Sequence, residues 1–128
     1  MLQSREGSQL DAISQLMDTH PNLFMCLRPI PPQAATDNPF GLRFYNLILS
    51  PSGIAPEWLA LLRRHSDRFV MGSDAFFVSS SANAEGPAAM LSRGTEARLT
   101  AAGVTLSRLP PDLLAKIAMA NPARIYRI

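Results

Sequence analysis

The chain has 128 residues, of which 47% are hydrophobic and 17% are charged, a composition that suits one domain with a core rather than a disordered tail. The net charge is only +2, and no basic stripe with interleaved aromatic residues is present, which argues against a nucleic-acid binder. No apolar run reaches the roughly 18 residues that a membrane span needs, and residues 1–7 lack the apolar segment of a signal peptide. We therefore expect a cytoplasmic protein with neither a membrane nor a nucleic-acid partner.

Few side chains in this sequence suit disulfide or metal chemistry. Cys26 is the only cysteine, which excludes an internal disulfide and a cysteine-based zinc site. Because Cys26 lies in an apolar run, we expect a buried small hydrophobic residue rather than a nucleophile. The two histidines, His20 and His65, are far apart and show neither HxH nor HExxH spacing. Both are expected to be solvated surface residues.

The first elements are a predicted helix and a predicted strand. Apolar residues at helical spacing predict a helix over residues 8–18, with Ser8 as its N-cap and Pro21 just beyond its end. The continuous apolar run at residues 22–27 predicts a strand buried on both faces, as in a parallel sheet. A long loop is expected to follow, to about residue 45, and then a short apolar stretch at 47–49 and a turn at 50–53.

The clearest helix is predicted over residues 56–64. Pro56 suits its first position, Glu57 suits the positive end of the helix dipole, and Arg63 and Arg64 suit the negative end. Trp58 is expected on its buried face. Residues 68–74 have a short apolar centre and predict a second parallel strand.

The rest of the chain is predicted to be mostly helical. A loop rich in Ser, Ala and Asn is expected at residues 75–86, followed by a helical region at 87–107 that glycines interrupt. Residues 112–120 predict a short helix that Asn121 and Pro122 end. The alternation of strands and helices predicts a parallel α/β arrangement with right-handed crossovers. Two principal strands make a very small sheet, which indicates that part of the fold is missing.

Three segments resemble the amidohydrolase-related family. Residues 56–74, PEWLALLRRHSDRFVMGSD, match its tryptophan-bearing helix followed by the last barrel strand, which ends in Gly-[Ser/Thr]-Asp. Residues 20–25, HPNLFM, are similar to the preceding strand, and residues 109–126, LPPDLLAKIAMANPARIY, are similar to the C-terminal closure. Pro122 departs from the closure pattern. The segments appear in family order and span nearly the whole chain.

The resemblance implies a (β/α)8 TIM barrel, of which residues 1–128 would form a single partial domain. Such barrels need about 250 residues. The chain would supply about strands 7 and 8 with the closing helices, as a C-terminal fragment. The HxH pair and the other histidine metal ligands of the family have no counterpart here. The zinc or other divalent metal of the family would therefore need histidines from elsewhere.

Asp74 is the strongest candidate for a catalytic and metal-binding residue. It ends the last predicted strand, where TIM barrels place catalytic groups. The resemblance implies that its carboxylate contacts the metal and accepts a proton from the attacking water; capping of the next segment is the simpler alternative. Arg28 would lie at the same barrel face and could bind a substrate carboxylate, although a solvated arginine is the more common case. Gly72 and Ser73 are expected to serve packing and the turn.

Two functional hypotheses of different classes follow. The first is the C-terminal fragment of a metal-dependent hydrolase or decarboxylase acting on small organic substrates, inactive without the rest of the barrel. The second is a non-catalytic interaction module that pairs with another chain, or with its own copies, through exposed strand edges. A small independent α/β enzyme is a third alternative.

Overall fold

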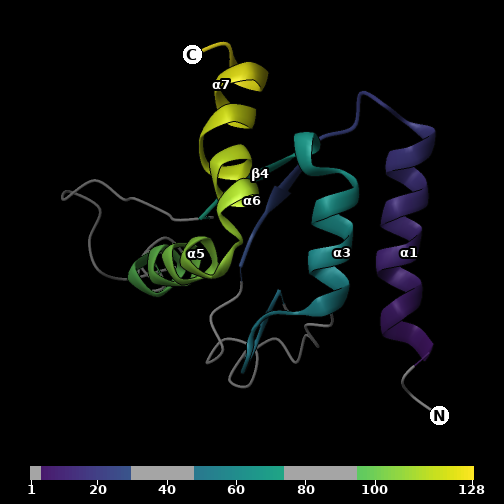
Figure 1. Cartoon of the computed structure of the whole chain (residues 1–128), viewed down its shortest axis with the longest axis horizontal. Helices are drawn as coiled ribbons and strands as arrows, with labels where there is room; N and C mark the ends of the chain where they lie inside the picture. Colours follow the sequence, from purple (N-terminus) through teal and green to yellow (C-terminus); the bar gives the residue numbers. More distant parts are fainter. Residues whose placement is uncertain (1–3, 30–47, 74–94) are drawn as a thin grey trace, which may run out of the picture.

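The computed structural model of the chain describes residues 4–29, 48–73 and 95–128. The described chain combines helices with a short parallel pair of strands, and a small hairpin forms a separate sheet. Figure 1 shows α1 and α3 as neighbours, and it shows α6 and α7 as one continuous column of helix.

Helix α1 (Ser4–Thr19) and strand β1 (Met25–Leu27) form the first part of the described chain. The helix ends just before His20 and Pro21, as predicted, because the residue before a proline avoids the helical region. Its start was predicted wrongly, since the helix begins at Ser4 and Ser8 lies inside it. The strand is shorter than the apolar run that predicted it.

A β-hairpin occupies the position of the predicted turn. Strand β2 (Leu49–Ser50) pairs antiparallel with β3 (Gly53–Ile54) across the two residues Pro51 and Ser52. Gly53 has a φ of 132°, a backbone conformation that residues with a Cβ rarely adopt, so a glycine is needed at this point. The predicted loop up to residue 45 lies outside the described residues.

Helix α3 (Pro56–Arg64) has the predicted bounds. Pro56 is in its first turn, Glu57 is near the N-terminus, and Leu61 and Leu62 are buried. His65 caps its C-terminus by donating its backbone N–H to the carbonyl of Leu61. A 3-10 helix, η1 (Ser66–Arg68), then leads directly into strand β4 (Phe69–Met71).

Strands β1 and β4 form the predicted parallel pair. Met25 lies opposite Phe69, Cys26 opposite Val70, and Leu27 opposite Met71. The pairing continues beyond the strands, because the Gly72 N–H donates to the Leu27 carbonyl at 2.8 Å. With α3 between them in sequence, β1 and β4 form a βαβ unit that also carries the hairpin in its connection.

Helix α5 (Thr95–Arg108) confirms the C-terminal part of the helical region that was predicted over residues 87–107. Residues 87–94 lie outside the described residues. The helix continues through Gly103, which is exposed and has open space beside its Cα.

The C-terminal helix was predicted to end at Asn121 and Pro122, and this prediction is wrong. Helix α6 (Pro111–Ala115), π-helix η2 (Lys116–Ala120) and α7 (Asn121–Tyr126) continue one another. A proline inside an α-helix lacks an N–H and crowds the carbonyl four residues earlier. The wider π turn before Pro122 removes that conflict, and the helix therefore goes on until Arg127, whose φ of 56° ends it.

One face of the parallel pair contributes to the main apolar core. Leu27 and Phe69 are buried there, and Met25 and Met71 pack against them. Helices α1, α3, α6 and η2 supply the facing side chains, which include Leu10, Met17, Leu61, Leu62, Leu113 and Ile117. Trp58 is partly buried against this core, which confirms its predicted packing role. Among the helices of the described residues, none is long and apolar enough to cross a membrane.

Candidate functional site

The predicted catalytic edge lies where β1 and β4 end. Parallel strands bring their carboxyl ends to the same edge of a sheet, so Arg28 and Ser73 both follow strands at this edge. Arg28 is exposed and Ser73 is half-buried. Asp74 is the next residue after Ser73, and it lies outside the described residues. The structure thus places Arg28 at the predicted edge and leaves the contacts of Asp74 untested.

The two faces of the β1–β4 pair have different surroundings. Side chains alternate along a strand, so Cys26 and Val70 face away from the core that Leu27 and Phe69 join. Val70 is buried outside that core, but Cys26 is exposed. The predicted burial of Cys26 is therefore wrong, and the main apolar core of the described residues lies on the opposite face of the pair.

Gly72 has a clear packing role. A Cβ built on it would collide with the Sγ atom of Cys26 on the neighbouring strand. A side chain at position 72 would therefore require the Cys26 thiol or the strands to move. The packing role predicted for Gly72 is thus confirmed, and the contact also shows that Gly72 and Cys26 share one face of the sheet.

The described residues do not by themselves form a metal site. Among them, no group of three or more His, Cys, Asp or Glu side chains lies close enough to hold an ion. A catalytic zinc takes three protein ligands and keeps one position open. Neither of the two histidines follows β1 or β4, so the side chains of residues 4–29, 48–73 and 95–128 do not by themselves supply the ligands of a zinc ion.

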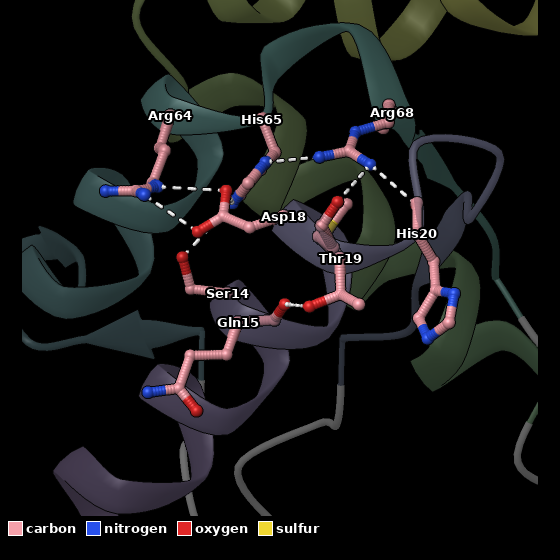
Figure 2. Close-up of polar contacts among 9 residues, drawn as sticks. Ser14, Gln15, Asp18, Thr19, His20, Arg64, His65 and Arg68 are labelled. Carbon is pink, nitrogen blue, oxygen red and sulfur yellow. Dashed lines mark hydrogen bonds and ion pairs between the residues drawn. The ribbon is translucent and has the colours of Figure 1, made fainter.

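A second group of polar side chains joins α1 to the turn that follows α3 (Figure 2). His65 is only 5% exposed, so its predicted place on the solvated surface is wrong. Its Nε2 atom is 3.1 Å from Ser14 Oγ and 3.7 Å from Asp18 Oδ1. Its Nδ1 atom is 2.6 Å from a guanidinium nitrogen of Arg68. His20, by contrast, is exposed, as predicted.

Arg68 also binds the C-terminal end of α1. Its guanidinium donates to the carbonyl of Met17 at 2.5 Å and to that of His20 at 3.0 Å. The Met17 carbonyl lies in the last turn of α1, where a helix leaves acceptors without a partner, and the His20 carbonyl also accepts from the N–H of Leu23. Arg64 adds an ion pair with Asp18 at 2.7 Å. The hydrogen bond from Arg64 is the largest of the effects that hold the pKa of Asp18 below its usual value.

The Ser14–His65–Asp18 set contains the residue types of a hydrolytic triad, but it lacks the geometry. In a triad the acid binds the imidazole nitrogen opposite the serine. Here Asp18 approaches the same nitrogen as Ser14, and Arg68 occupies the other one. Because a guanidinium only donates, Nδ1 must accept and Nε2 must carry the proton. His65 in this state cannot take a proton from Ser14. The cluster is therefore a structural joint, meaning a set of polar contacts that attaches α1 to α3 and η1.

The last helices are attached to η1 and β4 by a separate polar joint. Asn121 is 2% exposed and donates to the carbonyls of Ser66 at 2.7 Å and Phe69 at 2.8 Å. Lys116 donates to Ser66 Oγ at 2.9 Å and pairs with Asp67 at 2.8 Å. The hydrogen bond from Lys116 is the main cause that lowers the pKa of Asp67.

A shallow groove runs between α1 and α3 beside His65. Apolar and charged residues of both helices line it: Leu10, Asp11, Ser14, Glu57, Ala60, Leu61 and Arg64. The charged side chains at its rim are exposed, and Arg64 is already paired with Asp18. The groove therefore offers no buried polar group to orient a small molecule.

Sequence reasoning missed both polar joints. His65 and Arg68 are three residues apart across a helix end, which is the only local signal of their contact. Ser14 reaches His65 across 51 residues, and Asn121 reaches Phe69 across 52.

Searches for similar proteins with the sequence and with the structure found no matching family model, no matching curated protein and no matching solved structure.

Proposed function

We propose that the chain is the C-terminal part of a metal-dependent amidohydrolase-type barrel and acts only with the remaining strands. The observation that carries this proposal is the one-sided packing of the parallel pair. The main apolar core of the described residues lies on the Leu27 and Phe69 face, while on the other face Val70 is buried outside that core and Cys26 is exposed. A barrel strand has this arrangement, with helices outside and the barrel interior on the opposite side.

The positions of the candidate residues agree with a barrel interior. Side chains alternate along a strand, and Asp74 is two residues beyond Gly72, which shares a face with Cys26. Arg28 is likewise two residues beyond Cys26. Both would thus follow the interior face at the carboxyl edge of the strands, where TIM barrels bind substrates.

In this proposal the chain supplies an acid–base group and an anion-binding group. The Asp74 carboxylate would contact the metal and accept a proton from water, and the Arg28 guanidinium would pair with a carboxylate of a small organic substrate. The zinc or other divalent metal would be held mainly by histidines from the missing strands. The expected setting is the cytoplasm, without a membrane or nucleic-acid partner.

The test is reconstitution with strands one to six of an amidohydrolase-type barrel, co-expressed with this chain. We expect the chain alone to contain no stoichiometric zinc, and the complex to retain about one zinc per pair. Asp74→Asn should lower zinc retention in the complex, whereas Asp112→Asn, at an exposed position of α6, should leave it unchanged. Elemental analysis with light scattering measures both quantities. A monodisperse chain that holds its own zinc would contradict the proposal.

The exposed thiol allows an independent check. Cys26 is the only cysteine, so a thiol reagent should label this site in the isolated chain and should label it much more slowly in the complex. The matched control carries Cys26→Ser and Ser52→Cys, which moves the thiol to the exposed hairpin turn. Its labelling should be equally fast with and without the added strands. Equal labelling of Cys26 in both states would place that face outside a barrel interior.

A second candidate function is a non-catalytic interaction module. It is favoured by the pairing of β1 and β4, since within the described chain each of these strands pairs with no strand but the other. Unpaired strand edges accept further strands from another chain or from a second copy. A stable homo-oligomer, without affinity for the missing barrel strands, would favour this function over the first.

A further inference from the structure

We propose that the neutral imidazole of His65 holds the C-terminal half of α1 against α3 and η1. Protonation of this imidazole at acidic pH releases the helix. The proposal is independent of the barrel proposal, because it concerns only the joint shown in Figure 2.

The joint needs a neutral imidazole. Arg68 donates to Nδ1 at 2.6 Å, so this nitrogen must keep its lone pair. Protonation would set an N–H of the imidazolium against an N–H of the guanidinium at the same place. The contact that links His65 to Arg68 would then be lost, and with it the fixed position from which Arg68 reaches the carbonyls of Met17 and His20.

The charges that face His65 oppose a further positive charge. Within the described part of the chain, Asp18 on α1 is the carboxylate that acts on the imidazole, and it is already paired with Arg64 on α3. Arg68 of η1 contributes a second guanidinium. With one carboxylate and two guanidiniums, the group already has an excess of positive charge before the imidazole is protonated.

The burial of the imidazole also opposes its protonation. Desolvation is the main cause that lowers the pKa of His65 below its ordinary value, and Arg68 adds to it, while Asp18 opposes it. The released state, in which His65 is hydrated, therefore binds the proton more readily. The joint contributes fully above about pH 6.5, and its contribution is lost as the pH falls through the lowered pKa of the folded state.

The experiment is hydrogen exchange of the purified full-length chain, measured by mass spectrometry from about pH 7.5 to about pH 5. Rates are divided by the intrinsic exchange rate at each pH, and peptides from α5 and α7 serve as internal references. As the pH falls below about 6.5, we expect the protection of α1 peptides covering residues 9–19 to fall by up to about tenfold per pH unit. Protection in the reference helices should stay nearly constant.

Variants assign the effect to one histidine. His65→Asn places an amide oxygen near the position of Nδ1, so it keeps an acceptor for Arg68 and cannot titrate in this range. It should remove the pH dependence of α1. The chain has one other histidine, the exposed His20, and His20→Asn should leave the wild-type pH dependence intact.

A direct measurement covers the case in which His65→Asn fails to fold. Nitrogen-15 NMR of the wild-type imidazoles should show His65 with the proton on Nε2, and its titration midpoint should coincide with the loss of α1 protection. The proposal is overturned if α1 protection is independent of pH, or if it follows the titration of His20. A proton on Nδ1 in the neutral state would also overturn it.

Discussion

At the scale of single residues, the buried polar groups of this protein are paired with groups distant in sequence. Within the described residues, no buried side-chain nitrogen or oxygen lacks a hydrogen-bond partner. Asn121 is the clearest case, since its amide satisfies the carbonyls of Ser66 and Phe69 in the protein interior. A carbonyl that loses such a partner inside a protein keeps its desolvation cost, which makes these contacts sensitive to substitution.

Asn121→Ala should therefore lower the free energy of unfolding by about 2 to 4 kcal/mol, because it leaves both carbonyls without a donor. Urea denaturation followed by Trp58 fluorescence measures the change. Asn22→Ala is the control, since Asn22 is exposed and surface substitutions usually change stability by less than about 0.5 kcal/mol. Equal effects of the two substitutions would contradict the buried joint.

Gly72→Ala should destabilise the protein by about 1 to 3 kcal/mol, because its methyl group collides with the Cys26 thiol. Replacing Cys26 by Ala in the same chain should recover much of the loss, and this coupling is measured in a double-mutant cycle.

Gly103→Ala should raise the stability of the protein instead of lowering it. Its Cα faces open space in α5, and alanine should stabilise that helix by about 0.5 to 1 kcal/mol.

At the scale of elements, local signals predicted some helices well and failed where the partner is distant. The bounds of α3 follow from Pro56 and the charges at its ends, which are all local. The end of the C-terminal helix was predicted wrongly, because Pro122 usually stops a helix and only the π turn before it lets α7 continue. The burial of His65 depends on Ser14 and Arg68, and no local pattern reveals a contact across 51 residues.

Arg68→Met should loosen the attachment of α1, because the Met17 carbonyl loses its side-chain donor and the His20 carbonyl keeps only the N–H of Leu23. We expect a loss of about 2 to 4 kcal/mol in unfolding free energy, with faster hydrogen exchange in α1 than in α5. Arg63→Met is the matched control, since Arg63 is an exposed arginine of α3. A similar small effect of both substitutions would show that Arg68 does not hold the helix.

At the scale of the whole molecule, the parallel sheet has one covered face and one face with an exposed cysteine at its centre. The sequence predicted the parallel pair and its order, because short apolar runs flank a well-marked helix. It could not predict which face stays open, because that depends on where all the helices pack. The expected catalytic edge is formed by Arg28 and Ser73, and the role of Asp74 there remains a prediction.

The isolated chain should associate or have poor solubility, because unpaired strand edges favour contact with other chains and Cys26 is exposed on one face of the sheet. Cys26→Asp should shift the assembly toward monomer, since it places a charge on that face of every copy. Ser52→Asp in the exposed turn should leave the assembly unchanged. Light scattering measures the oligomeric state of both variants. A clean wild-type monomer that unfolds in one cooperative transition would contradict this prediction.

The joint at Asn121 also has a consequence for protein synthesis. The carbonyl of Phe69 receives its donor from a residue made 52 positions later. While the ribosome is still adding α5, the residues of β4 have been made, but the Phe69 carbonyl lacks that donor. The sheet can therefore reach its final packing only after the chain has emerged through residue 121, and a nascent chain that stalls earlier would expose this defect to chaperones and proteases.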